Sequence, residues 1–344
     1  MLRDRIGGVC LALACALALL GAAARAQTAK VEEFYRGKTI RLVIGIGAGS
    51  TYDAYARLLA RSMVKYIPGH PQILPQQMPG AGSLNAFNHI YNAAPRDGTV
   101  FGTGHRSVLL MPLFNQPGPQ FDARKFSYIG SANSEVVLLI AWRASGIASI
   151  EDLKSREMLL GTTGSGAELE DLNQLVARVL GARIRIISGY PDTRAIDLAL
   201  ERGEIQGRST SYSSLKTAQP RWLAEDRVNL LVQLGAAKHA ELPQVPWIVD
   251  LVADPLDKQA VSLLTAPSVM GRIFVGTPDI PADRLAALRQ AFQQALADPE
   301  LLAEAARQKL EISPTGGAEL AALIDRLYSA PPPVLARAAA LVGE

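Results

Sequence analysis

Short apolar segments that alternate with helix-patterned segments constrain the fold of this chain more than any other feature. In its first part, strand-like residues 39–45, 72–78 and 99–104 are separated by residues 52–66 and 83–93, whose apolar side chains recur at helical spacing. Alternation of this kind predicts a parallel sheet covered by helices. The sequence therefore predicts an α/β unit at the start of the chain.

A second α/β pattern follows a stretch rich in proline and glycine at residues 111–120. Gly203 stops the last helix of this pattern. The expected strands are residues 136–142, 158–161, 184–188 and part of 204–211, and the expected helices begin after Ser149, near Ala167 and at Thr193. This second unit spans roughly residues 134–250.

The carboxyl-terminal part, from residue 280 onwards, is mostly helical, with apolar side chains at helical spacing in residues 281–297. Such a tail cannot bury its apolar faces alone, so we expect it to pack on the first unit. The chain would then cross between domains near residues 130–134 and 247–254. The predicted organisation is a signal peptide at residues 1–26, domain 1 at 27–133 plus 254–344, and domain 2 at 134–253.

The amino terminus has the pattern of a secretory signal peptide. Basic residues precede an apolar run at residues 9–20, and small residues lead to a cleavage site after Ala26. The run is too short for a membrane anchor, which needs about 20 residues. A lipoprotein cut before Cys15 is less favoured, because no leucine lies three residues ahead of it. We therefore expect a periplasmic protein.

Composition excludes several functions. Both cysteines, Cys10 and Cys15, lie in the expected signal peptide, so the mature chain has no disulfide, thiolate metal site or cysteine nucleophile. Removing three arginines and one aspartate from 35 basic and 32 acidic side chains leaves 32 and 31, a formal net charge of +1. This balance gives no electrostatic case for a nucleic-acid partner. The length suffices for two domains.

Glycine-rich loops lie between an expected strand and an expected helix at three places. They read GIGAGS at residues 45–50, PGAGS at 79–83 and GTTGSG at 161–166. Glycine allows close approach of the backbone, and free N–H groups in the first turn of a helix attract anions. The alternative for each loop is a tight connection in which glycine and serine serve turns and caps. All three together, at strand ends where open α/β sheets bind ligands, favour a carboxylate site.

The first loop departs from nucleotide-binding motifs. A dinucleotide fingerprint needs G-x-G-x-x-G followed by an acidic residue at the end of the second strand, where this chain has Gln76 and Gln77. The GKT at residues 37–39 precedes the strand, which excludes a P-loop. We therefore expect no nucleotide and no other cofactor.

No residue pattern indicates catalysis or metal binding. The four histidines, at positions 70, 89, 105 and 239, lack metal-ligand spacing. Ser165 has no acid and histidine in hydrolase order after it. The remaining alternatives to a binding protein are a secreted hydrolase that uses the Ser165 loop and a ligand sensor that signals to a membrane partner. Three tryptophans in apolar surroundings are interpreted as structural: Trp142, Trp222 and Trp247.

Four further side chains are candidates for a ligand site. Asp53 is spaced for an i,i+4 pair with Arg57, and it also has the position to fix the first loop or to accept from a ligand hydroxyl. Arg208, at the end of an expected strand, suits a bidentate pair with a ligand carboxylate, with surface exposure as the alternative. Tyr52 and Tyr190 suit either a cleft wall or core packing.

A family resemblance joins these features. In order, the chain contains FYRGKTIRLVIGIGAGSTYDAYARLLAR, IPGHP, QQMPGAGSLNAFNHIYNAAPRDGTVFG, GTTGSG, SGYPDTRAIDLALERGEIQGR and GRIFVGTPDIPADRLAALRQAF. From about Val31 to the carboxyl terminus, it resembles the periplasmic solute receptors of tripartite tricarboxylate transporters, the Bug or TctC-like proteins. One departure is that Ser50-Thr51 stand where members often have paired glycines before the loop aspartate.

The resemblance implies an α/β, two-domain Venus-flytrap fold in which each domain is a sheet with covering helices. It also implies a non-enzymatic receptor that captures a small carboxylate in the interdomain cleft and delivers it to one large and one small integral membrane subunit. We expect this receptor to be a monomer. The predicted ligand-binding residues are Gly47, Ala48, Gly49, Ser50, Thr51, Tyr52, Asp53, Gly80, Ala81, Gly82, Ser83, Thr163, Gly164, Ser165, Gly166, Tyr190 and Arg208.

Overall fold

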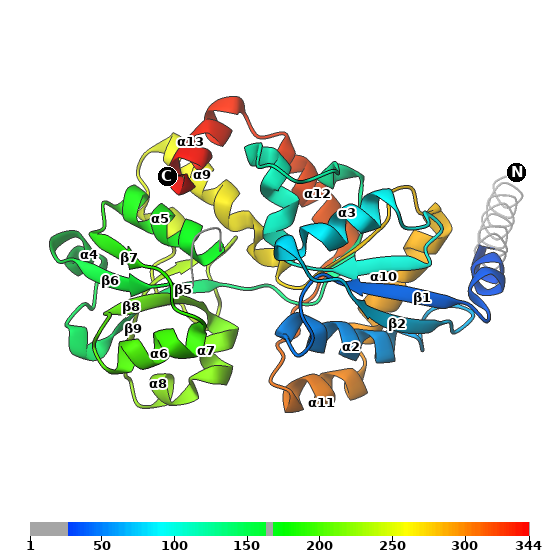
Figure 1. The fold of residues 1–344 in the computed structure, drawn as a ribbon, viewed down its shortest axis with the longest axis horizontal. Helices are drawn as coiled ribbons and strands as arrows, with labels where there is room; N and C mark the ends of the chain where they lie inside the picture. Colours follow the sequence, from blue (N-terminus) through cyan, green and yellow to red (C-terminus); the bar gives the residue numbers. More distant parts are fainter. Residues whose placement is uncertain (1–26, 163–167, 344) are drawn as a thin grey trace, which may run out of the picture. The chain divides into compact units, whose positions relative to one another are not determined.

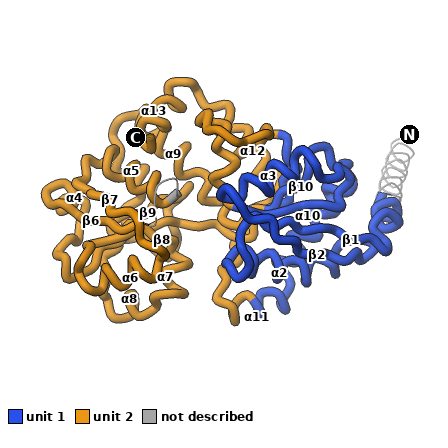
Figure 2. The backbone as a smooth tube through the Cα atoms, viewed as in Figure 1, with its two compact units in different colours: residues 1–104, 125–130, 274–304 blue, residues 105–124, 131–273, 305–344 orange. Residues whose placement is uncertain are grey.

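A computed structural model describes residues 27–162 and 168–343. The predicted signal peptide and the predicted loop Thr163–Gly166 lie outside these ranges. The chain divides into two compact units (Figure 2). Unit 1 comprises residues up to 104, 125–130 and 274–304, and unit 2 comprises residues 105–124, 131–273 and 305–344.

The strands of unit 1 follow the order β4-β10-β3-β1-β2. Figure 1 labels two of these neighbours, β1 and β2. They are β1 (Thr39–Ile44), β2 (Gln72–Gln77), β3 (Val100–Thr103), β4 (Ser127–Ser131) and β10 (Ile273–Gly276). β1 pairs in parallel with both β2 and β3, whereas β10 pairs antiparallel with β3. The predicted parallel arrangement is therefore confirmed for β1, β2 and β3, and β10 adds an antiparallel strand from a distant part of the chain, outside the alternating pattern.

Helices α2 (Thr51–Met63) and α3 (Leu84–Asn92) pack on the strands of unit 1. α2 buries one face, which includes Tyr55, Leu59 and Met63, and the buried strand β1 provides the apolar surface beneath it. α10 (Ala282–Leu296) packs on α2, and just after α10 the Asp298 carboxylate accepts a hydrogen bond of 3.2 Å from Ser62. This part of the tail packs on the first α/β pattern, as predicted.

Unit 2 contains a second sheet, with the strand order β7-β6-β8-β5-β9. Its strands are β5 (Val137–Trp142), β6 (Met158–Gly161), β7 (Ile184–Ile187), β8 (Gly207–Ser211) and β9 (Val228–Leu234). β6 is parallel to β7 and β8, and β5 is antiparallel to β8 and β9. This sheet is therefore also mixed, although each predicted strand is present.

Most remaining elements belong to unit 2. The α-helices of unit 2 are α4 (Ile150–Ser155), α5 (Glu168–Leu180), α6 (Thr193–Glu201), α7 (Tyr212–Ala218), α8 (Pro220–Ala224), α9 (Pro255–Thr265), α12 (Gly317–Tyr328) and α13 (Pro332–Val342). Helix α11 (Pro299–Arg307) begins in unit 1 and ends in unit 2. The short elements of the chain are η1 (Ala81–Ser83), η2 (Arg106–Phe114), η3 (Ala123–Lys125), η4 (Arg143–Ser145), η5 (Ile248–Leu251), η6 (Ala266–Met270) and β11 (Thr315–Gly316). Ser149 caps α4 through a reciprocal capping box with Asp152, which confirms the predicted start of this helix.

The carboxyl-terminal helix α13 differs from the sequence expectation. It packs against α9 and α5 within unit 2, and Arg337 forms an ion pair with Asp257 of α9. Arg178 of α5 donates a hydrogen bond of 2.8 Å to the carbonyl of Ala340. The helical tail is therefore shared between the units, because its apolar faces match different partners.

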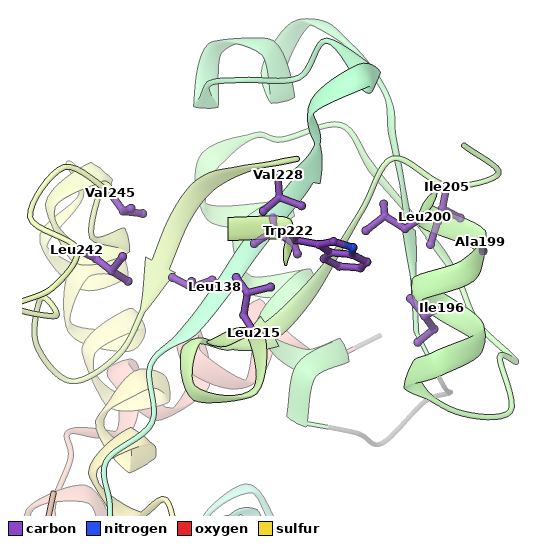
Figure 3. Packing of buried hydrophobic residues seen from close by; sticks show 11 residues of the cluster. Leu138, Ile196, Ala199, Leu200, Ile205, Leu215, Trp222, Val228, Leu242 and Val245 are labelled. Carbon is purple, nitrogen blue, oxygen red and sulfur yellow. The ribbon is translucent and has the colours of Figure 1, made fainter. Parts of the chain in front are cut away.

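Trp222 lies at the centre of the apolar cluster in unit 2 (Figure 3). Its side chain is 2% exposed, its indole N–H donates to Glu201 at 3.0 Å, and its ring meets that of Trp142 edge-on at 5.3 Å. Leu138, Leu200 and Leu215 belong to the same cluster. The structural interpretation of Trp142 and Trp222 is therefore confirmed. None of the helices in the described ranges is both long and apolar enough to cross a membrane.

Candidate ligand-binding site

Three parallel strands of unit 1 end at one edge of their sheet. Ile44, the last residue of β1, is in register with Gln77 of β2 and with Thr103 of β3. The loop that follows β1 and the loop that follows β2 therefore leave the sheet from neighbouring positions. Open α/β sheets bind ligands outside the carboxyl ends of their strands, so this edge is the candidate site in unit 1.

Asp53 holds the first loop in place. Its side chain is 8% exposed and accepts hydrogen bonds from the N–H of Gly49 at 3.0 Å, from Arg57 Nε at 2.8 Å and from Gln77 Nε2 at 2.7 Å. The predicted i,i+4 pair with Arg57 is thus confirmed, as is the predicted contact with the loop. Three protein donors occupy most of its acceptor capacity, which favours loop positioning over contact with a ligand hydroxyl.

The environment of Asp53 keeps its carboxyl group ionised. Burial alone would raise the pKa of Asp53, but hydrogen bonds from Arg57, the Gly49 N–H and Gln77 outweigh burial and lower this pKa overall. Ser50 is the N-cap of α2, and its hydroxyl accepts from the Asp53 N–H at 3.2 Å. Capping and loop fixation together make the start of α2 a pre-organised turn.

The second loop has an unusual backbone. Gly80, Ala81, Gly82 and Ser83 all have positive φ, at 133°, 45°, 60° and 84°. For Ala81 and Ser83 this conformation costs on the order of 1–3 kcal/mol each. Residues strained in this way persist only where the surrounding structure holds them, and they cluster at functional sites.

Two glycines make room for Ser83, which is 1% exposed. A Cβ on Gly45, after β1, would lie 2.8 Å from the Cβ of Ser83, and a Cβ on Gly104, after β3, would lie 2.7 Å from it. Any larger residue at either position would displace the second loop. Ser83 therefore packs where the ends of β1 and β3 come together, and the loops after β1 and β2 form one structural unit.

Other glycines leave the backbone of both loops accessible. A Cβ on Gly47, Gly49 or Gly82 would meet no described atom within 4 Å. These three residues are also exposed, together with Ala48 and Ala81. A ligand can therefore approach the main chain of both loops closely, beside the amino end of α2 and its positive dipole.

In unit 2, Arg208 is buried inside the sheet–helix interface. It lies on β8, is 4% exposed, and its Nε is 2.8 Å from Asp197 Oδ1 on α6. Gln219 donates to the other oxygen of Asp197 at 2.7 Å, and the Arg208 guanidinium lies 5.8 Å from the centre of the Trp222 ring. The alternative of surface exposure for Arg208 is wrong, because these contacts cover it. Its charge already has a carboxylate partner within the protein.

Burial determines the direction in which the pKa values of Asp197 and Arg208 shift. Burial raises the pKa of Asp197, and the neighbouring Arg208 offsets only part of this shift. Burial likewise lowers the pKa of Arg208, with Asp197 acting against it. Tyr190, which follows β7, packs partly buried against the Trp222 cluster. The two tyrosines Tyr52 and Tyr190 are both half-buried, and their contact with a ligand stays a prediction.

Sequence reasoning missed Gln77, Gly45 and Gly104. Gln77 was noted only because it is not acidic, although a polar residue at a strand end, on the face that carries α2, is a usable signal. Gly45 and Gly104 each directly follow a strand, but their contact with Ser83 depends on register. Among the described residues, no group of three or more His, Cys, Asp or Glu is arranged to hold a metal ion.

Comparison with known proteins identifies the fold. No family model matches the chain. A UPF0065 protein of Bordetella bronchiseptica is 27% identical over 290 residues, which cover 83% of this chain and 79% of that protein. A TctC solute-binding protein from Polaromonas, solved without ligand, matches with a TM-score of 0.67 and 16% identity, over 86% of this chain and 96% of its own.

Three further structures share the fold at 17–19% identity. The periplasmic binding protein BugD has a TM-score of 0.61, over 90% of this chain and 99% of its own. MatC of Rhodopseudomonas palustris, solved with bound malate, has a TM-score of 0.56, over 89% and 99%. Rpa4515 of the same organism, solved with adipate, has a TM-score of 0.60, over 89% and 97%.

These matches define the class: the chain has the fold of two-domain periplasmic binding proteins. Within that class, its neighbours are the TctC and Bug-type solute-binding proteins, and the resemblance predicted from the sequence motifs is confirmed.

Proposed function

We propose that this chain is a periplasmic receptor that binds a small dicarboxylate and delivers it to a membrane transporter of the tripartite tricarboxylate type. One observation carries the proposal: two adjoining loops of unit 1 expose glycine backbone. Asp53 holds the first loop through the Gly49 N–H, and the buried Ser83 anchors the second loop. Two neighbours of the same fold hold dicarboxylates, malate in one and adipate in the other, which supports the ligand class.

The chemistry of this edge favours an anion. Backbone N–H groups in the first turn of a helix have no partner within the helix, and the helix dipole places about half a positive charge there. A carboxylate bound to such groups needs no lysine or arginine. The Asp53 side chain does not repel it strongly, since Arg57 pairs with its charge and the Gly49 N–H and Gln77 donate hydrogen bonds to it.

Binding and not catalysis is the proposed role. The described residues at this edge supply donors and a fixed backbone, with no paired acid and base. Delivery to the transporter and a periplasmic location rest on the signal-peptide pattern of residues 1–26 and on the resemblance to periplasmic receptors.

Thermal unfolding of residues 27–344 against a panel of dicarboxylates, tricarboxylates, aromatic acids and amino acids tests the proposal. A ligand at 100 times its dissociation constant adds about 2.7 kcal/mol to the free energy of unfolding. We expect malate or adipate to raise the midpoint and the monocarboxylate butyrate to leave it unchanged. A panel without any shift would contradict the receptor function.

A further inference from the structure

A surface groove lies beside the candidate site in unit 1, between α2 and the edge strand β2, which are neighbours in Figure 1. Its volume is about 450 Å³. The residues that define this α2–β2 groove are Arg57, Ala60, Arg61 and Val64 of the α2 segment, with Gln72, Ile73 and Pro75 of β2. The four helical positions follow i, i+3, i+4 and i+7 spacing, so they share one face of α2.

The groove combines an apolar floor with positive charge. Val64, Ile73 and Pro75 supply apolar surface beside Ala60, which is itself only 4% exposed, while Arg61 is exposed and has no ion pair with any residue in the described ranges. The side chain of Arg57 is 46% exposed and engages Asp53 through Nε. Such a surface complements a segment that carries both carboxylates and apolar side chains.

The edge strand favours recognition through side chains. β2 pairs with β1 alone, so its outer side has no strand neighbour in the described sheet. Pro75, in the middle of β2, has no N–H for an added strand, which disfavours pairing with a partner strand. An amphipathic helix laid in the groove needs no such donor, since it binds through residues at i, i+3 and i+4.

The groove is connected to the candidate ligand loop by a short chain of hydrogen bonds. Arg57 donates to Asp53 at 2.8 Å, and Asp53 accepts the Gly49 N–H at 3.0 Å. Arg57 engages Asp53 through Nε, and the Nη groups of its guanidinium are further donors, so a partner carboxylate that binds them shares this guanidinium with Asp53. Occupancy of the groove therefore alters the support of the loop that carries Gly49.

We propose that the α2–β2 groove docks an acidic amphipathic helix of a partner protein, and that Arg57 transmits this docking to the loop through Asp53. The docking part of this proposal rests only on the residues of the α2–β2 groove and does not depend on the ligand site. The coupling rests on the proposed function, because it assumes that the loop binds a carboxylate.

A labelled synthetic peptide of repeating Glu-Leu-Leu-Glu units tests the docking by fluorescence anisotropy. We expect saturable binding to residues 27–344 and at least about tenfold weaker binding to Arg61→Glu. The matched variant Arg36→Glu reverses an exposed arginine elsewhere in unit 1 and should leave the affinity unchanged. No saturation up to about 1 mM peptide, or equal losses in both variants, would overturn the docking.

Two further experiments test whether the peptide binds in the groove and whether the surface binds protein or membrane. Ile73→Ser should weaken the peptide, whereas Leu74→Ser should not, because neighbouring strand residues face opposite sides of the sheet. Leu74 is 58% exposed, so its replacement should not disturb folding. Binding of phosphatidylglycerol vesicles together with failure of the peptide would replace the protein partner with a membrane surface and overturn the proposal.

The coupling has its own readout. Saturating peptide should change the malate affinity of the unmodified chain by the same factor by which malate changes peptide affinity. This factor should fall to one in Arg57→Gln. An unchanged factor in Arg57→Gln would overturn the route through Asp53. Absence of any carboxylate binding would refute the proposed function and the coupling, while the peptide arms would still decide the docking.

Discussion

Two aspartates, one in each unit, have the same small exposed fraction but differ in the direction of their pKa shifts. Asp53 and Asp197 are both 6% exposed and both pair with an arginine. The pKa of Asp53 is lowered, because hydrogen bonds that include a backbone N–H outweigh burial, whereas the pKa of Asp197 is raised, because burial outweighs Arg208. The pair in unit 1 thus holds a loop at the edge of a sheet, whereas the pair in unit 2 is part of the buried interior.

The largest expected effect comes from breaking the interior pair. Arg208→Met leaves the Asp197 carboxylate buried without its cation, which should cost about 3–5 kcal/mol of unfolding free energy. Urea unfolding measures this loss. Replacing both partners, as Asp197→Leu with Arg208→Met, should recover most of the loss, since a buried ion pair exchanged for apolar side chains is often close to neutral.

The same variant tests whether Arg208 contacts ligand. If Arg208→Met lost carboxylate affinity while its unfolding free energy stayed unchanged, Arg208 would belong to the ligand site and the contrast between the two aspartates would fail.

The next effect concerns the contact between loops at the edge of unit 1. Gly45→Ala places a Cβ 2.8 Å from that of Ser83, and overpacking of this kind typically costs about 1–3 kcal/mol. We also expect weaker carboxylate binding, because the second loop must shift. Gly47→Ala, in the same loop but with no described atom within 4 Å of the new Cβ, is the matched control for stability. Equal destabilisation by both variants would contradict the packing of Ser83.

Helix capping gives a smaller and more selective effect. Ser50→Ala removes the N-cap of α2, and Ser149→Ala removes that of α4 in unit 2. Each should cost about 1 kcal/mol. Calorimetry should then show reduced carboxylate affinity only for Ser50→Ala, because only this cap lies beside the candidate loop. Reduced affinity in Ser149→Ala as well would mean that affinity simply follows stability.

The smallest expected effect is a difference in pH dependence. Because the pKa of Asp53 is lowered in the folded state, its contribution to stability is present above the unfolded pKa of about 3.9 and is lost as pH falls below it. The pKa of Asp197 is raised, so its carboxyl group favours the folded state at low pH and this contribution is lost as pH rises through the folded pKa.

Urea midpoints between pH 3 and pH 7 separate the two groups. Asp53→Asn should reduce the loss of stability on acidification, and Asp197→Asn should increase it relative to the unmodified chain. Changes of the same sign in both variants would show that the two carboxyl groups have similar environments.

Local patterns in the sequence predicted much of the fold. The start of β1 at Thr39, the cap at Ser149 and the pair of Asp53 with Arg57 are all set by residues within a few positions of one another, and each is confirmed. The antiparallel strand β10 was missed, because its place depends on pairing with β3 far away in the chain.

The candidate site was predictable in part for the same reason. The exposed glycine loops follow from strand-to-helix spacing, whereas the positive φ of Ala81 and Ser83 has no signature in their residue types. Arg208 has a suitable chemistry for a carboxylate, but its partner Asp197 lies on α6, and only the register of β8 under this helix brings them together. The role of Thr163–Gly166 stays a prediction.

The most direct test of the account is a malate titration of residues 27–344 labelled with ¹⁵N only in glycine, followed by NMR. We expect the amide signals of Gly47, Gly49 and Gly82 to move with one common dissociation constant, while that of Gly37, before β1, does not move. Saturable malate binding that leaves these three amides unmoved would contradict the assignment of the carboxylate site to the loops after β1 and β2.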